Sequence, residues 1–202
     1  MRNYYKDMNK IYFNKIAHKW DRMIYHDPQK LNWFFEKLSL KEGNVVLDVG
    51  TGTGILIPYI LRRIGKKGKI FAIDISNKMI EIAKKRHLSP NIFFILGDVE
   101  EYEFKDILFD NIICYSVFPH FCEQEKTIKK LSLLLKSSGS LSVFHSASRR
   151  YINNIHRENG FHFEKNILPP AKDVADMMVN SGLSVPLIYD NDTLYLVIGK
   201  KK

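Results

Sequence analysis

Short apolar runs alternate with amphipathic, charge-rich segments from residue 45 to residue 145 of this chain. The runs are short and continuous, as in strands buried on both faces, and the segments between them carry apolar residues at helical spacing. Strands are predicted at 45–49, 69–73, 91–96, 110–115 and 140–145, with helices at 55–64, 77–86 and 123–136. This alternation predicts an α/β fold with a parallel sheet covered by helices on both faces.

The two ends of the chain follow different patterns. Residues 3–40 are rich in aromatic residues, and Phe13, Ile16, Ala17 and Trp20 recur at helical spacing. Asp27-Pro28 interrupts this pattern, and a second helix is predicted at 31–38, with Gly43 closing it before the first strand. After the fifth strand, 146–170 predicts an inserted helix with a loop, and 171–180 predicts a closing helix. Strands at 183–189 and 193–198 are joined by a turn so short that they must form an antiparallel hairpin.

Composition restricts the class of protein. The chain has 202 residues, of which 45% are hydrophobic and 26% charged, as expected of one globular domain. We divide it into an N-terminal helical region (1–42), a core (43–145), an insertion (146–170) and a closing helix with hairpin (171–202). No apolar run is long enough for a membrane span, residues 1–19 do not form a secretion signal, and two cysteines make no disulfide framework. We expect a cytoplasmic protein that is a monomer or a homodimer.

The net charge of +9 raises the question of a polyanionic partner. The lysines are scattered in pairs such as Lys66-Lys67 and Lys84-Lys85, with no long basic run that includes aromatic residues. A lysine-rich solvated surface is therefore the preferred interpretation, and nucleic-acid binding stays open as the lesser one.

The first strand leads into the most informative motif, in which Gly50, Gly52 and Gly54 stand at every second position after Asp48. Glycines at this spacing predict a tight turn where backbone approaches a ligand closely. A dinucleotide fingerprint would need a third glycine at position 55, which is Ile55.

Acidic residues also stand at the ends of the next two strands, Asp74 and Asp98. In an open α/β sheet, ligands bind outside the carboxyl ends of the strands. There one carboxylate can accept hydrogen bonds from ribose hydroxyls (Asp74), another from an adenine amine (Asp98), and a third can face a cationic amino-acid end (Asp48). The sequence thus predicts a pocket for a nucleotide cofactor.

This arrangement resembles the class I S-adenosylmethionine-dependent methyltransferases. The glycine turn resembles their motif I, and Asp74, Gly97-Asp98, the strand at 109–113 and the closing hairpin follow in family order. The stretch 13–21 resembles the aromatic lid helix of small-molecule enzymes of the methyltransferase type 11 group, which includes ubiquinone and menaquinone methyltransferases. The resemblance implies a Rossmann-like fold of about seven strands with only the last antiparallel, and S-adenosylmethionine as cofactor.

The resemblance also implies residue roles. The backbone of Gly50 and Gly52 would pass the methionine part of the cofactor, Ile75 and Met79 would flank the adenine, and Tyr115 would lie near the transferred methyl group. The implied cofactor set is Asp48, Gly50, Thr51, Gly52, Gly54, Asp74, Ile75, Met79, Asp98, Val99 and Tyr115.

Candidates for catalysis follow the fourth and fifth strands. Methyl transfer requires an acceptor held in line, and a general base helps when the acceptor is a hydroxyl, an amine or an acidic carbon. The candidate catalytic residues are Tyr115, His120, His145 and His156. The three histidines could alternatively bind a divalent metal, but they lack a spacing motif and we assign no metal site.

Substrate contacts are predicted at both ends of the chain. Arg149 and Arg157 would bind an anionic acceptor, or else form an exposed basic helix face. Tyr12 and Trp20 would wall the substrate pocket, or else pack the N-terminal helix onto the domain.

We therefore predict transfer of a methyl group to a small acceptor that is anionic or aromatic. One alternative is an RNA methyltransferase, which the charge favours, although the Asn/Asp-Pro-Pro-aromatic motif of amino-group methyltransferases is missing after the fourth strand. The other is a non-catalytic cofactor-binding module, against which Asp74 and Asp98 argue.

Overall fold

A seven-stranded sheet forms the centre of the molecule in a computed structural model, which describes residues 2–158 and 167–202. The strand order is β3-β2-β1-β4-β5-β7-β6, and β7 runs in the direction opposite to that of the other six strands. The predicted α/β sheet with an antiparallel last strand is confirmed. The strands are β1 (Val45–Val49), β2 (Lys69–Asp74), β3 (Ile92–Leu96), β4 (Phe109–Tyr115), β5 (Leu135–His145), β6 (Leu183–Asp190) and β7 (Tyr195–Lys201).

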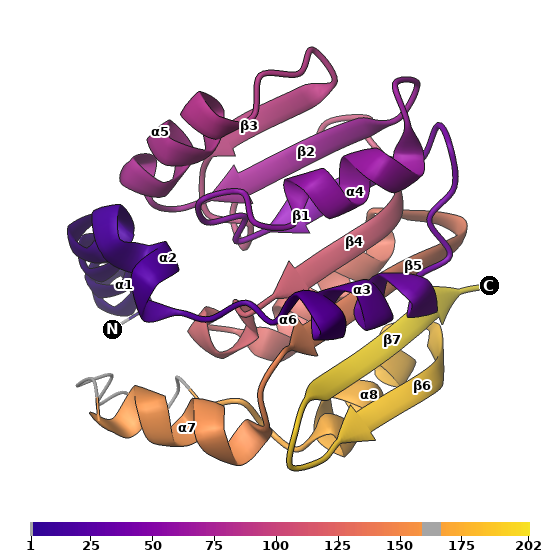
Figure 1. Ribbon diagram of the computed structural model, residues 1–202. Coiled ribbons are helices and arrows are strands. Elements are labelled where there is room, and N and C mark those ends of the chain that lie inside the picture. The colour runs from indigo at the N-terminus through magenta and orange to yellow at the C-terminus, as the bar shows by residue number, and fades with distance from the viewer. Residues whose placement is uncertain (1, 159–166) are drawn as a thin grey trace.

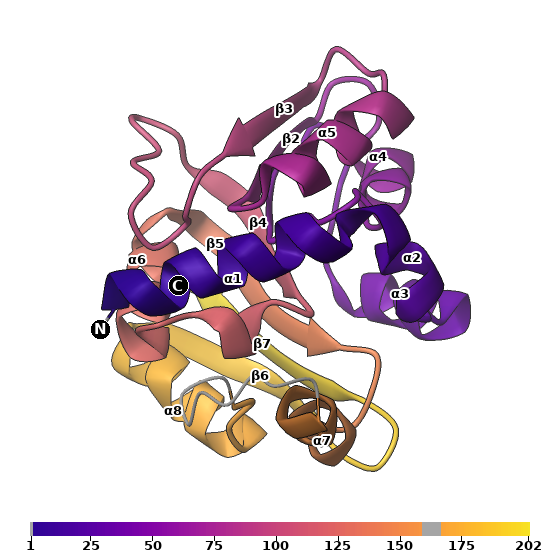
Figure 2. The same ribbon diagram turned by 90° about the vertical axis from the view of Figure 1, so that its left-hand side faces the viewer.

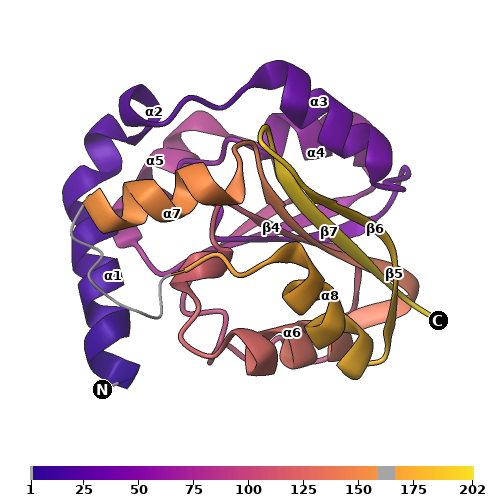
Figure 3. The same cartoon turned by 90° about the horizontal axis from the view of Figure 1, so that it is seen from below.

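Helices cover both faces of this sheet (Figures 1 and 3). One face carries α3 (Pro28–Lys37), α4 (Ile57–Ile64) and α5 (Asn77–Arg86), and the other carries α6 (Gln124–Leu133) and α8 (Ala171–Asn180). Each face has its own buried core: Phe34, Phe35 and Ile60 lie in one, and Ile128 and Val174 in the other. Burial of these side chains on both faces provides the main driving force for this arrangement.

The N-terminal segment lies across the carboxyl ends of the strands, as Figure 2 shows. It comprises α1 (Arg2–Ile16), the 3₁₀ turn Ala17–Lys19 and α2 (Trp20–Met23). On the same side lies α7 (Arg149–Glu158), the helix predicted in the insertion (Figure 3). Residues 159–166 of that insertion lie outside the described part of the chain.

Several helix ends differ from the prediction. The helix predicted at 55–64 begins at Ile57, because the glycine turn continues to Leu56 and Pro58 suits the first helical turn. The helix predicted at 31–38 begins at Pro28, where Asp27 caps it, and ends at Lys37, so Gly43 does not close it. In contrast, 77–86 is confirmed, with Ser76 Oγ accepting from Met79 N as the predicted N-cap.

The start of β5 was predicted wrongly. The helix expected at 123–136 ends at Leu133, and β5 begins at Leu135 rather than at Ser140. Leu135 is buried and pairs with Phe109, and a bulge in the ladder accommodates the polar residues that follow. Bulges of this kind are not visible in an apolar pattern.

Among the described residues, no helix is both long enough and apolar enough to cross a bilayer.

Candidate functional site

A deep cleft lies at the carboxyl ends of the parallel strands, with about 970 Å³ of empty space including the part open to solvent. The loops after β1, β2, β3 and β4 form one wall, and α1 and α2 contribute the other.

The glycine turn after β1 lines the cleft. Gly50 and Gly52 have φ values of +67° and +56°, a region that favours glycine. A Cβ on Gly50 would lie 2.5 Å from Cγ2 of Val117, whereas one on Gly52 would meet nothing closer than 3.9 Å. Gly50 is thus required by packing as well as by φ, and Gly52 by φ alone.

Two carboxylates are buried beside this turn. Thr51 Oγ1 donates to Asp48 Oδ2 at 2.6 Å, and Asp74 accepts from Gly52 N and Ser76 N, both at 2.8 Å. Burial raises the pKa of Asp48 to about 7 and that of Asp74 to about 6. Asp74 therefore connects the glycine turn to the start of α5, and Asp48 is an acid that a cationic ligand group would stabilise in its charged form.

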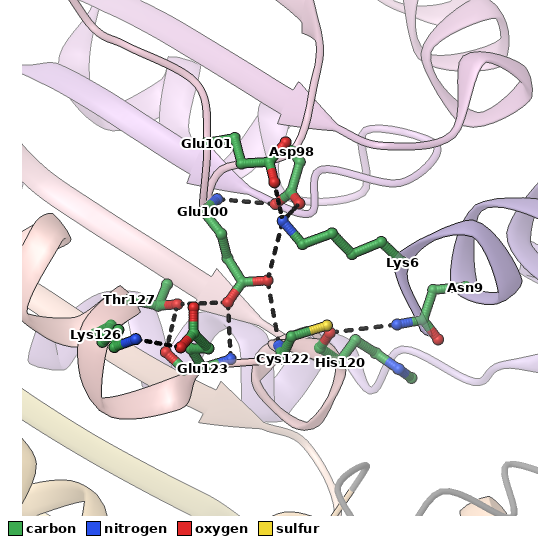
Figure 4. A network of polar contacts seen from close by, with 10 residues as sticks. All are labelled: Lys6, Asn9, Asp98, Glu100, Glu101, His120, Cys122, Glu123, Lys126 and Thr127. Atoms are coloured by element: carbon green, nitrogen blue, oxygen red, sulfur yellow. Dashed lines mark hydrogen bonds and ion pairs between the residues drawn. The ribbon is translucent and has the colours of Figure 1, made fainter. Parts of the chain in front are cut away.

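The acid after β3 is ion-paired with the N-terminal helix (Figure 4). Lys6 of α1 forms an ion pair with Asp98, lies 2.8 Å from Glu101 Oε1 and lies 3.8 Å from Glu100 Oε2. Burial would lower the pKa of Lys6, but its hydrogen bonds to Asp98 and Glu101 raise it above the usual value.

Other polar side chains of the N-terminal segment bind further loops of the cleft. Asn9 Nδ2 donates to the carbonyl of His120 at 3.3 Å, and Asn14 Oδ1 accepts from Ser76 Oγ at 2.7 Å. On α2, Asp21 accepts from Thr53 Oγ1 at 2.7 Å. The segment is therefore hydrogen-bonded to each loop that lines the cleft, and it forms part of the site.

A chain of three polar side chains lies at the β4 end of the cleft. Tyr115 Oη is 2.9 Å from His26 Nδ1 and 3.0 Å from Ser146 Oγ. Burial lowers the pKa of His26, so the imidazole is neutral at pH 7. Ser116, the next residue after Tyr115, has a φ of 53°, a strained conformation for a non-glycine residue at this wall.

The three histidines proposed for catalysis are only partly brought together. His120 lines the cleft, and its ring centroid is 5.0 Å from that of His156. His145 is buried beside Tyr195 and is not among the described lining residues, and burial lowers its pKa to about 3. Among residues 2–158 and 167–202, no three His, Cys, Asp or Glu side chains are grouped so that they could hold a metal ion.

The predicted cofactor residues gather as a set. All of them except Gly54 line the cleft: Asp48, Gly50, Thr51, Gly52, Asp74, Ile75, Met79, Asp98, Val99 and Tyr115. A Cβ on Gly54 would lie 2.7 Å from the ring of His87, so this glycine allows close packing against the residue that follows α5.

The predicted substrate residues separate. Trp20 lines the cleft, whereas Tyr12, Arg149 and Arg157 are not among its described lining residues. Arg149 instead forms an ion pair with Asp190 at the end of β6, with Nε and Oδ2 3.0 Å apart.

Sequence reasoning missed Lys6, Asn9 and His26, which all line the cleft. For Lys6 and Asn9 a signal existed, because they continue the helical spacing of Phe13 and Ile16 toward the N-terminus. For His26, which follows α2 in a non-helical segment, we find no local signal.

Comparison with known proteins agrees with this geometry. A family model described as a methyltransferase domain matches residues 40–182. The ubiquinone/menaquinone biosynthesis C-methyltransferase of Wigglesworthia glossinidia brevipalpis is 29% identical over 140 residues, which cover 65% of this chain and 56% of that protein. A malonyl-[acyl-carrier protein] O-methyltransferase of Priestia megaterium is 36% identical over 141 residues, covering 67% and 50%. The chain spans about half the length of these two curated relatives.

Solved structures share the fold. A SAM-dependent methyltransferase from Aquifex aeolicus aligns with a TM-score of 0.69 at 23% identity, covering 94% of this chain and 98% of that one. Magnesium protoporphyrin IX methyltransferase from Synechocystis, solved with bound SAH, aligns with a TM-score of 0.72 at 17% identity, covering 98% of this chain and 100% of that one. At this identity the likeness concerns the fold.

Proposed function

The chain belongs to the class I S-adenosylmethionine-dependent methyltransferase family, and from this premise we propose that it transfers a methyl group from S-adenosylmethionine to a small-molecule acceptor. The observation that carries the proposal is the convergence of Asp48, Asp74 and Asp98 with the glycine turn on one cleft.

The residues present fit this cofactor. At Gly50 and Gly52 the backbone lines the cleft in a conformation that a residue with a side chain would strain. Asp48 provides a buried carboxyl group suited to a cationic amino-acid end. We propose that Asp74 accepts from the ribose hydroxyls and Asp98 from the adenine amine. Ile75, Met79 and Val99 would then enclose the base.

For the acceptor we propose an aromatic or otherwise flat apolar molecule. Aromatic residues line the cleft, namely Phe13, Trp20, Tyr115 and Phe121. Among the described lining residues, Lys6 is the one lysine and none is an arginine, and Lys6 is already paired with carboxylates. This composition favours stacking over recognition of an anionic group.

When bound, the cofactor supplies a methyl group on a positively charged sulfur, and that sulfur departs as a neutral thioether. The chain's residues then need to orient the acceptor, exclude water and accept a proton. We propose His26 for the last task. Its Nδ1–H can donate to Tyr115 Oη, which can donate to Ser146 Oγ, and this tautomer leaves the lone pair of His26 Nε2 free. Nε2 is buried and has no hydrogen-bond partner in the described part of the chain.

The proposal is tested by incubating the protein with methyl-tritiated S-adenosylmethionine and a cell extract separated into metabolites, RNA and protein. We expect label in the metabolite fraction, extractable into organic solvent if the acceptor is aromatic. Label in RNA or protein alone would overturn the small-molecule assignment, and no transfer to any fraction would favour a binding module.

A further inference from the structure

We propose that Lys6 is a positioning residue for the cofactor, which acts through Asp98 and couples the packing of helix α1 to binding of the adenine edge. This inference rests on the proposed function, because it assumes that Asp98 contacts a bound adenine. Lys6 belongs to helix α1 and lies far from the glycine turn in the sequence.

Lys6 is surrounded by negatively charged side chains. Its side chain is buried, with the residue 7% exposed, and it faces three carboxylates from one short loop: Asp98, Glu100 and Glu101. The side chains of Asp98 and Glu100 are only 16% and 5% exposed. Without the ammonium group, two like charges would remain in a site with little water, which is strongly unfavourable. Lys6 therefore holds this loop in its observed conformation.

The carboxylate of Asp98 is itself held in place by the protein. Its Oδ1 accepts from Glu100 N at 2.8 Å, and its Oδ2 faces Lys6. Both oxygens are thus oriented by the protein, and each keeps a further lone pair. An adenine amine can therefore bind to a carboxylate that is already fixed in place, so less ordering is needed when the cofactor binds.

Hydrogen bonds connect this loop to the rest of the cleft (Figure 4). Glu100 accepts from Cys122 N at 3.2 Å, from Glu123 N at 2.9 Å and from Thr127 Oγ1 at 3.0 Å, at the start of α6. One turn along α1 from Lys6, Asn9 binds the carbonyl of His120 in the same loop region. The first half of α1 is therefore attached to the cleft through Lys6 and Asn9, and Asp98 is the point where this attachment meets the cofactor.

The experiment is a double-mutant cycle on binding of S-adenosylhomocysteine, measured by calorimetry on the full chain. We expect Lys6→Met to weaken binding about tenfold or more in the wild-type background and less than about twofold in an Asp98→Asn background. Lys10→Met, at an exposed position of the same helix, is the matched control and should leave the affinity unchanged.

Multiplicative effects of the two substitutions, or unchanged affinity of Lys6→Met, would overturn the inference. Lys6→Arg is the second variant, which keeps the cation and should stay within about threefold of wild type; a loss as large as that of Lys6→Met would contradict a role for the charge. If the unsubstituted protein does not bind S-adenosylhomocysteine, the proposed function fails instead.

Discussion

Asp48 and Asp74 are carboxyl groups whose properties are set by burial beside the glycine turn. Burial raises the pKa of both, so between the usual value of 3.8 and the raised value the folded chain holds a proton that the unfolded chain has released. Their contribution to stability is therefore fully present below about pH 3.8 and is lost progressively as the pH rises from there to about 6 for Asp74 and about 7 for Asp48.

Asp48→Asn removes the titrating group and keeps an acceptor for the hydroxyl of Thr51. We compare the free energy of unfolding of the variant with that of wild type at each pH. We expect this difference to be about 2–3 kcal/mol more favourable to the variant at pH 8 than at pH 5. Urea unfolding of both proteins at the two pH values measures this difference. A difference that does not change with pH would show that Asp48 is not buried as a carboxyl group.

The two glycines of the turn give a matched pair of substitutions. Both would place an alanine in the left-handed region at a cost of about 1–2 kcal/mol. Gly50→Ala should lose about 1–3 kcal/mol more than Gly52→Ala, because only its Cβ overlaps Val117. Thermal unfolding of the two variants measures this order, and equal losses would contradict the packing of the turn against Val117.

His26 is the residue on which the proposed proton transfer depends. We expect His26→Gln to reduce methyl transfer about 100-fold or more while the affinity for S-adenosylhomocysteine stays within about threefold. The labelled-methyl assay and calorimetry provide the two measurements, with His18→Gln on the exposed side of the N-terminal segment as control. Transfer at the wild-type rate would assign His26 a purely structural role.

At the residue scale, the sequence predicted the site residues that lie at strand ends. It did not predict those that reach the cleft from the N-terminal segment. Asp74 and Asp98 follow apolar runs directly, so their place at the edge of the sheet could be predicted. Lys6 and His26 reach the cleft through contacts with residues 95 and 89 positions away, Glu101 and Tyr115. No local pattern encodes such contacts, and a side chain's orientation on a helix needs the tertiary fold.

At the scale of elements, the helix ends depend on capping. Asp27 Oδ1 accepts from Gln29 N at 2.9 Å and from Lys30 N at 3.3 Å, and Pro28 follows as the first helical residue of α3. Leu31, Phe34 and Phe35 of α3 are buried in the core on one face of the sheet. The cap at the start of α3 therefore helps to stabilise that core.

Asp27→Ala should lower the free energy of unfolding by about 1 kcal/mol, because two backbone N–H groups lose their acceptor. Asp27→Ser keeps a capping oxygen and should lose less. Urea unfolding of both variants tests this expectation, and a larger loss for serine than for alanine would contradict the capping role.

Helices and strands with a clear hydrophobic periodicity can be predicted from the sequence, but their first and last residues are less predictable. Helix α5 agreed to the residue because Ser76 is an evident cap before a periodic segment. The beginning of β5 was wrong because Leu135 completes an apolar period with Leu131 and is equally suited to pair with Phe109, and only the sheet decides between the two.

At the scale of the whole molecule, the order of the strands explains where the cleft lies. The sheet extends from β1 toward β2 and β3 on one side and toward β4 and β5 on the other. Ligands bind where the chain reverses direction in this way, and the glycine turn leaves β1 at that point. The segment from α1 to α2 then lies across the opening (Figure 2). This position explains why Asn9, Asn14 and Asp21 form hydrogen bonds to loops that line the cleft.

The most direct test of the central claim is a calorimetric titration of the protein with S-adenosylmethionine and with S-adenosylhomocysteine, repeated on Asp74→Ala. We predict that both compounds bind with dissociation constants of about micromolar size and that the substitution abolishes binding. If neither compound binds, or if Asp74→Ala binds them as tightly as wild type, the assignment of this cleft to the cofactor is contradicted.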